Sequence, residues 1–127
     1  MEIKLTNEES EEYFYNALSN GGLSLLENSG IILSYDKDQY KLAAEKLTDS
    51  CFEDVLMQIL IDGNKLSFID LEGDGEYSRE VTLELVHQRV NKMPQKHLLD
   101  LVQENDDAIT ADVLLQSVLY DGEIIFG

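Results

Sequence analysis

The sequence predicts an α+β fold, in which a single compact domain, residues 1–127, holds a small antiparallel or mixed sheet covered by about five helices. Three observations lead to this fold class. The length of 127 residues suits one domain. Apolar residues recur at helical spacing in several segments, whereas residues 65–82 alternate on both sides of a glycine-rich turn and predict a central hairpin. The predicted elements also lack the regular strand–helix alternation of a doubly wound parallel sheet.

The first predicted elements are a helix, an ambiguous segment and a strand. Thr6 precedes Glu9 at the spacing of a capping box, and further carboxylates fill the first turns, where they meet the positive end of the helix dipole. The sequence NGG at 20–22 ends this helix. The stretch GLSLLENSG that follows fits either a helical turn or a loop. Residues 31–35, IILSY, are rich in strand-forming side chains and predict a strand.

Two helices are predicted between this strand and the hairpin. Asp36 or Asp38 caps the first, a short helix with four inward side chains: Tyr40, Ala43, Ala44 and Leu47. Ser50 and Glu53 form a second capping-box pattern for the next helix, which ends at Gly63. The apolar stripe of this second helix follows helical spacing and consists of Phe52, Val55, Leu56, Ile59 and Leu60.

Three helices and a closing strand are predicted after the hairpin. Thr82 caps the first of these helices, and Pro94 begins the second, because a proline fits the first helical position. The polar stretch ENDDAIT separates the second helix from the third. After a turn at 121–122, the short apolar run near 123–126 predicts a strand that completes the sheet.

Acidic residues dominate the composition. Twenty-six acids against nine lysines and arginines give a net charge of −17. This sign argues against direct binding to nucleic acid or to an anionic membrane, and it favours a basic protein as the partner. No lysine or arginine follows Lys96, so the C-terminal quarter is expected to present a negative surface. The candidate partner-binding residues in this quarter are Asp100, Glu104, Asp106, Asp107 and Asp112, and a second acidic patch covers Glu8 to Glu12.

The stretch DLEGDGEYSREV, residues 70–81, shares half of the calcium-binding EF-hand pattern. Acids stand at positions 1, 3 and 5 and glycine at position 6, but Val81 replaces the glutamate of position 12. Strand-like segments flank the stretch, whereas a calcium loop joins two helices. We therefore predict a hairpin turn through EGDG. A weak divalent-cation site remains the alternative, and its ligands would be Asp70, Glu72, Asp74 and Glu76.

No catalytic pattern stands out in the sequence. Cys51 lies near a predicted helix N-terminus, a position that lowers the pKa of a thiol, but no sequence pattern brings a histidine base to it. His87 and His97 lack the spacing of zinc ligands. Glycine-rich phosphate loops and the GxSxG motif are absent from the sequence. We therefore expect a protein that is not an enzyme and has no cofactor.

The sequence also bears on the compartment. No apolar run approaches the ~20 residues that span a bilayer. The N-terminal stretch MEIKLTNEESEE is acidic and has no apolar core, so it does not predict a secretory signal. The lone Cys51 cannot form an internal disulfide, and together these features favour the reducing cytoplasm. In length, acidity and α+β pattern the chain resembles many small proteins of bacterial and phage genomes.

Three functional hypotheses follow from these observations. The first is a small acidic, non-catalytic binding or accessory protein with a basic protein partner. A sharper alternative is a decoy whose carboxylates imitate phosphates and block a basic nucleic-acid-binding protein, as anti-restriction, anti-CRISPR and immunity proteins do. A second alternative is a homo-oligomeric structural protein, in which the terminal apolar run would extend a neighbour's sheet.

Overall fold

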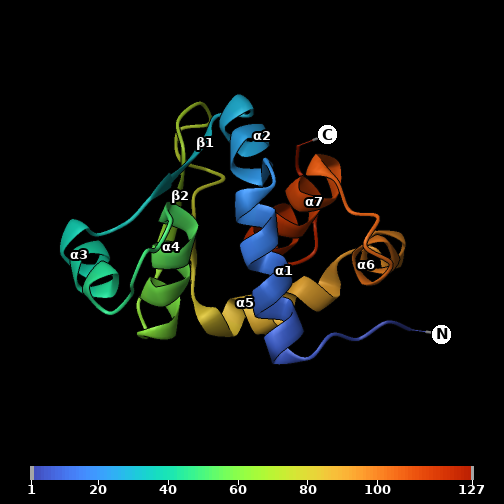
Figure 1. The fold of residues 1–127 in the computed structure, drawn as a ribbon. Helices are drawn as coiled ribbons and strands as arrows, with labels where there is room; N and C mark the ends of the chain where they lie inside the picture. Colours follow the sequence, from blue (N-terminus) through green and yellow to red (C-terminus); the bar gives the residue numbers. More distant parts are fainter. Residues whose placement is uncertain (1, 127) are drawn as a thin grey trace.

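The computed structural model describes residues 2–126 (Figure 1). Along these residues the chain forms seven α-helices, one short 3-10 helix and three strands. In chain order they are α1 (Asn7–Ser19), α2 (Gly22–Asn28), β1 (Ile31–Ser34), α3 (Lys37–Glu45), α4 (Phe52–Ile61), β2 (Leu66–Asp70), β3 (Arg79–Val81), α5 (Leu83–Arg89), η1 (Val90–Lys92), α6 (Gln95–Val102) and α7 (Ala108–Leu119). The fold is α+β, as predicted, and the ambiguous segment after the first helix is the additional helix α2.

The sheet is antiparallel, with the strand order β1–β2–β3. The predicted central hairpin is therefore confirmed, and β1 adds to its first strand. Because strand side chains alternate between two faces, β2 buries Leu66, Phe68 and Asp70 on one face and places Ser67 and Ile69 on the other. Helices pack on the first face, and the second face is partly open to solvent.

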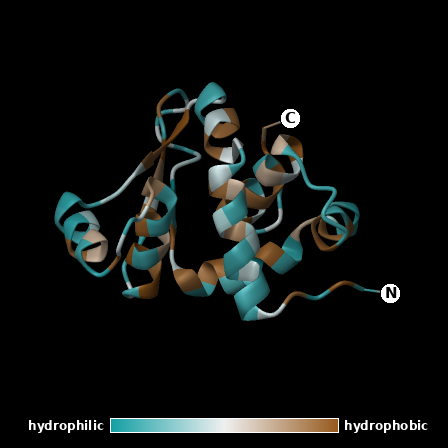
Figure 2. Cartoon of the chain, in the orientation of Figure 1, coloured by the Kyte–Doolittle hydropathy of each residue, from teal (hydrophilic) through white to brown (hydrophobic). Residues whose placement is uncertain are grey.

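The hydrophobic core lies between the inner face of the sheet and the helices. Figure 1 shows α1 crossing the middle of the molecule, and it contacts both α4 and α7. Nine of the twelve residues of α7 are buried, which makes it the central helix. Figure 2 shows hydrophobic residues along α4 and α7, whereas α3 is mainly hydrophilic. Within residues 2–126, no helix is both long enough and apolar enough to cross a bilayer.

Side-chain caps fix most of the helix starts that the sequence predicts. The Thr6 hydroxyl accepts a hydrogen bond from the Glu9 amide at 3.1 Å, and the Glu9 carboxylate accepts one from the Thr6 amide at 2.9 Å. Asp36 caps α3 by accepting from two backbone amides. The Thr82 hydroxyl caps α5 in the same way at 3.3 Å. These short-range contacts explain why local sequence patterns located the helices.

The start of α4 differs from the prediction by one residue. Cys51, and not Ser50, is the N-cap residue, and the Asp54 carboxylate accepts a hydrogen bond from the Cys51 amide at 3.0 Å. This bond lowers the pKa of Asp54. The predicted pair of Ser50 and Glu53 is therefore wrong by one position, because the neighbouring acidic residue Asp54 takes the capping role.

The predicted closing strand near 123–126 is also wrong, because this segment pairs with α7 rather than with the sheet. The buried Gln116 side chain accepts hydrogen bonds from the amides of Ile125 and Phe126 at 2.9 and 2.8 Å. Its amide group donates to the Phe126 carbonyl at 2.9 Å and to the Asp112 carboxylate at 2.9 Å. One glutamine therefore satisfies the backbone groups that a neighbouring strand would have satisfied.

Candidate functional site

The loop between β2 and β3 is organised by the carboxylate of Asp70. Asp70 is 6% exposed, and its two oxygens accept from the amides of Glu72, Gly73 and Tyr77 at 3.0, 2.9 and 3.1 Å. The Asp70 amide donates to the Ser78 hydroxyl at 2.8 Å. The hydrogen bonds from Gly73, Tyr77 and Glu72 lower the pKa of Asp70 against the opposing effect of burial. Asp70 thus closes the turn that the sequence predicts.

The pKa shift of Asp70 predicts a pH-dependent effect of the Asp70→Asn substitution. A carboxyl group with a lowered pKa in the folded state stabilises the fold above the unfolded-state pKa of about 3.9, and this contribution disappears as the pH falls through the folded-state pKa. We expect Asp70→Asn to lower the melting temperature by several degrees near neutral pH and to lose this effect in strong acid. Thermal unfolding at both pH values tests this, with the exposed Asp74→Asn as the control. A decrease that is the same at both pH values would contradict the assignment.

The other three acids of the divalent-cation hypothesis lie on the exposed part of this loop. Glu72 lies against Gly30, which directly precedes β1, and Asp74 has a left-handed backbone with φ of 54°. Asp74 and Glu76 are both exposed. Across residues 2–126, no three side chains of His, Cys, Asp or Glu are grouped as metal ligands. The oxygens of Asp70 already bind backbone amides, so the geometry of this loop favours a structural role for Asp70.

Two of the five candidate partner-binding acids bind within the chain. The Asp107 carboxylate caps α7 by accepting from the Thr110 amide at 3.0 Å, and this bond lowers its pKa. Asp112 is half-buried, and burial raises its pKa although Gln116 donates a hydrogen bond to it. Asp100 is also partly covered. Glu104 and Asp106 lie in the loop between α6 and α7; Glu104 is exposed, Asp106 is partly covered, and neither carboxylate forms a hydrogen bond or ion pair within the described residues.

The two acidic segments singled out in the sequence meet at Tyr13. Burial raises the pKa of Tyr13, and the negative charges of Glu9, Glu12, Asp106 and Glu104 raise it further. Carboxylates act on a phenol in this way when they lie close to it. The first turns of α1 and the α6–α7 loop therefore both bring negative charge to the neighbourhood of Tyr13. We call Glu9, Glu12, Tyr13, Glu104 and Asp106 the acidic face.

Glu104 has an unusual backbone conformation for its residue type. Its φ is 58°, in the left-handed region that favours glycine, and it follows the end of α6. The Asn105 amide closes the helix end by donating to the Asp100 carbonyl at 2.8 Å. A glycine at this position would remove the backbone strain, so a glutamate here is consistent with a role for its charge.

Exposed apolar side chains flank the same loop in the sequence. Val102 ends α6 and is 41% exposed, and Ile109 in the first turn of α7 is 64% exposed. Leu99 lies one helical turn before Val102 and is 43% exposed. Apolar side chains beside charged ones are typical of protein–protein contact surfaces. The α6–α7 loop therefore has exposed apolar residues before and after it in the chain.

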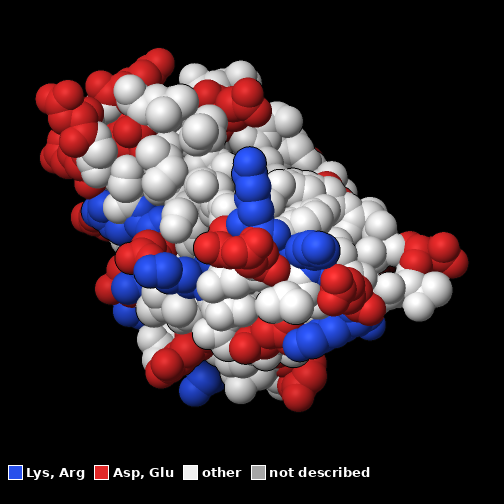
Figure 3. Space-filling view, turned by 90° about the vertical axis from the view of Figure 1, so that its left-hand side faces the viewer, with Lys and Arg blue, Asp and Glu red and all other residues white. Residues whose placement is uncertain are grey.

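The side of the molecule that carries α3 and α4 has charged side chains of both signs. Figure 3 shows this side, on which blue basic side chains alternate with red acidic ones across the centre, whereas acidic side chains gather near the top. Lys46 pairs with Asp62 at 2.8 Å, and Lys65 pairs with Glu80. Lys37 and Lys41 lie on the exposed helix α3. The charges on this side are mixed, which distinguishes it from the acidic face.

Cys51 and His87 have partners other than one another, whereas Nδ1 of His97 is buried without a hydrogen-bond partner among the described residues. The Cys51 sulfur lies 3.4 Å from the Tyr15 hydroxyl, at the contact between α1 and α4. Nε2 of His87 lies 2.8 Å from a carboxylate oxygen of Glu11 on α1. These contacts tie helices together, and they do not form a nucleophile–base pair among the described residues.

No family model matches this chain, and neither a curated protein nor a solved structure matches it. Sequence reasoning named the acids of both segments, but it did not identify Tyr13 as their meeting point. No signal in the sequence could have shown this, because Tyr13 and the acids of the α6–α7 loop are far apart along the chain.

Proposed function

We propose that this protein is a non-catalytic acidic binding protein whose partner is a basic protein. The observation that carries the proposal is the acidic face, where carboxylates from α1 and from the α6–α7 loop converge on Tyr13. In the described residues, no lysine or arginine forms an ion pair with an acid of this face. Its carboxylates therefore have no cationic partner within the described residues, although that of Glu9 also accepts a hydrogen bond from the Thr6 amide.

Physical principles explain what such a face does. The net charge of −17 attracts a basic protein over a distance of about one Debye length, roughly 8 Å at physiological salt. This attraction speeds the encounter, and the specific arrangement of carboxylates then sets the orientation of the partner. The apolar side chains of Val102 and Ile109 support the contact once water has been displaced.

A pair of matched double variants tests the proposal. Glu104→Gly with Asp106→Asn removes two charges from the acidic face, and Asp49→Gly with Glu45→Gln removes two exposed charges near α3. Glu104 and Asp49 both have positive φ, 58° and 53°, so each glycine relieves the same backbone strain and should stabilise the fold by about 1 kcal/mol. Affinity capture from the cells that produce the protein, washed at increasing salt, measures the retained partner.

We expect the Glu104/Asp106 variant to release its basic partner at lower salt than the wild type does. Its affinity for the partner should fall about two- to tenfold, since each exposed charge pair contributes about 0.2–1 kcal/mol. The Asp49/Glu45 variant should retain the partner as the wild type does. Equal release by both variants would show that net charge alone is responsible and would refute the acidic face. If duplex DNA displaces the captured partner from this protein, the function is that of the phosphate-mimicking decoy.

A further inference from the structure

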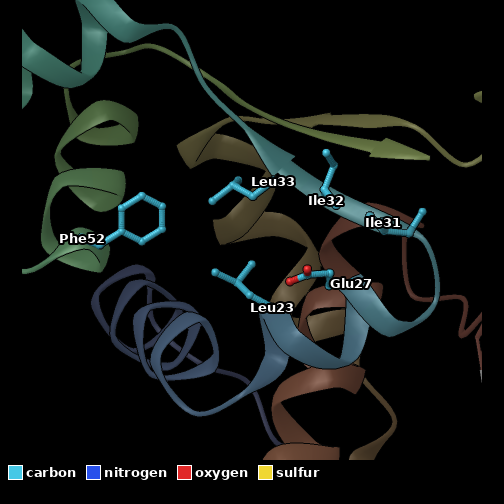
Figure 4. Close-up of a pocket in the computed structure, with 6 residues that line it drawn as sticks. All are labelled: Leu23, Glu27, Ile31, Ile32, Leu33 and Phe52. Carbon is cyan, nitrogen blue, oxygen red and sulfur yellow. The ribbon is translucent and has the colours of Figure 1, made fainter. Parts of the chain in front are cut away.

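A cavity of about 330 Å³ lies between α2, β1 and the start of α4. Its lining residues are Leu23, Glu27, Ile31, Ile32, Leu33 and Phe52, and we call it the β1 groove. Figure 4 shows Leu23 and Glu27 projecting from α2 towards β1, with Phe52 closing the far side. The acidic face is built from other residues, so the groove is a separate feature of the molecule.

The side chains that line the β1 groove are apolar with one exception, although polar atoms make up a large share of its exposed lining. Five of its six lining residues are leucine, isoleucine or phenylalanine. The sixth is Glu27, which is exposed and whose carboxylate has no hydrogen bond or ion pair with any other described residue. A carboxylate beside an apolar cavity matches a lysine or arginine side chain, which has an apolar stem and a cationic end.

Aromatic packing holds the Phe52 wall in place although Phe52 is 39% exposed. Its ring lies 5.9 Å from that of Tyr35 and 6.1 Å from that of Tyr40, and these two tyrosines stack at 4.9 Å. Such ring pairs contribute about 0.5–1.5 kcal/mol beyond the area that they bury. The groove is therefore preformed on this side, which reduces the entropy that a ligand loses on binding.

The edge of β1 offers main-chain hydrogen bonds in the same groove. The Gly30 carbonyl accepts from the Leu71 amide at 2.9 Å, and the Asp70 amide points away from β1 to Ser78. Because bonding alternates along an antiparallel ladder, the amides and carbonyls of Ile31 and Leu33 point to the free edge. Ile31 is only 1% exposed, so the β1 edge is covered at that residue. Leu33 is less buried, and its main-chain groups are the ones that a ligand can reach.

We propose that the β1 groove binds an extended segment of the basic partner, inserting one lysine or arginine side chain. The stem of that side chain packs between Leu23, Leu33 and Phe52, and its cationic end pairs with Glu27. The backbone of the segment bonds the free amide and carbonyl of Leu33, as in other cases of strand addition. This inference rests on the proposed function, because it assigns a site for a residue of the same basic partner.

A synthetic peptide of about seven alternating lysines and valines, blocked at both ends, is a suitable probe because it favours an extended strand. NMR titration of the intact protein should shift the signals of Leu23, Leu33 and Phe52, and hydrogen exchange of the Leu33 amide should slow. The Glu27→Gln variant should bind about two- to fivefold more weakly, since it loses one ion pair. Glu123→Gln, which removes an exposed charge near the C-terminus, should bind as the wild type does.

A second peptide with glutamine in place of the central lysine completes a double-mutant cycle with Glu27→Gln. We expect coupling, so that the lysine matters in the wild type and much less in the Glu27→Gln variant. Additive effects, or an unchanged exchange rate at Leu33, would overturn the inference. The double variants of the acidic face test the proposed function separately: if they release the partner while the cycle shows no coupling, the groove assignment alone has failed.

Discussion

Replacing Gln116 by leucine is expected to lower the free energy of unfolding by about 3 kcal/mol and the melting temperature by about 10 °C. Gln116 is fully buried and makes four hydrogen bonds, three of them to the backbone of Ile125 and Phe126. Leucine fills a similar volume, but it leaves those backbone groups and the half-buried Asp112 carboxylate without their partner. An unsatisfied buried polar group costs about 1–3 kcal/mol.

The same substitution should free the C-terminal segment locally. Hydrogen exchange of the Ile125 and Phe126 amides is expected to become fast in Gln116→Leu while exchange in the middle of α7 stays slow. Gln103→Leu is the matched control, because Gln103 is exposed at the end of α6 and its side chain has no hydrogen bond in the described residues. Comparable losses of stability in the two variants would show that the glutamine network is not what holds this segment.

The second large effect is expected from Gly22→Ala, which should destabilise the fold by about 2 kcal/mol. Gly22 is buried at the start of α2, where that helix packs against α7. A Cβ atom at this position would lie 2.6 Å from the carbonyl oxygen of Ala17 and 2.7 Å from Cδ1 of Leu115. The carbonyl belongs to the backbone of α1, so relief of the clash requires a helix to move.

Gly63→Ala is the control for this prediction. A Cβ atom at Gly63 meets nothing within 4 Å, but its φ of 89° strains an alanine by about 1 kcal/mol. Denaturant unfolding should therefore rank the variants as wild type, Gly63→Ala and Gly22→Ala in order of decreasing stability. If Gly63→Ala were the more damaging change, backbone strain would outweigh helix packing, and the close contact of α2 with α7 would be misassigned.

Much of the fold was predictable because its signals are local. The side chains of Thr6, Asp36 and Thr82 cap helices within three residues of themselves, and the hairpin follows from alternation around a glycine-rich turn. The prediction failed at Ser50, where two adjacent residues offered similar capping patterns and Asp54 decided between them. It failed again at 123–126, where apolar composition alone cannot show which element will satisfy the backbone.

For the candidate site, the sequence identified the acids but not their arrangement. Asp107 and Asp112 looked equivalent to Glu104 and Asp106 in the sequence, yet the structure uses the first two inside the chain. The β1 groove had no sequence signal, because Glu27 lies in the stretch that fits a helical turn or a loop equally well. Glu27 comes to line the same groove as Leu33 and Phe52 only when α2, β1 and α4 pack together.

By itself, the sequence determined the fold class, the starts of α1, α3 and α5, the hairpin and the strongly negative charge, because these depend on residue type and on neighbours within a few positions. Only the tertiary structure decided that the C-terminal segment binds Gln116 and that Glu27 faces an apolar groove. It also decided that acids of α1 and of the α6–α7 loop both raise the pKa of Tyr13. The physical reason is that these contacts join distant parts of the chain. Their formation depends on how whole elements pack, which no local pattern records.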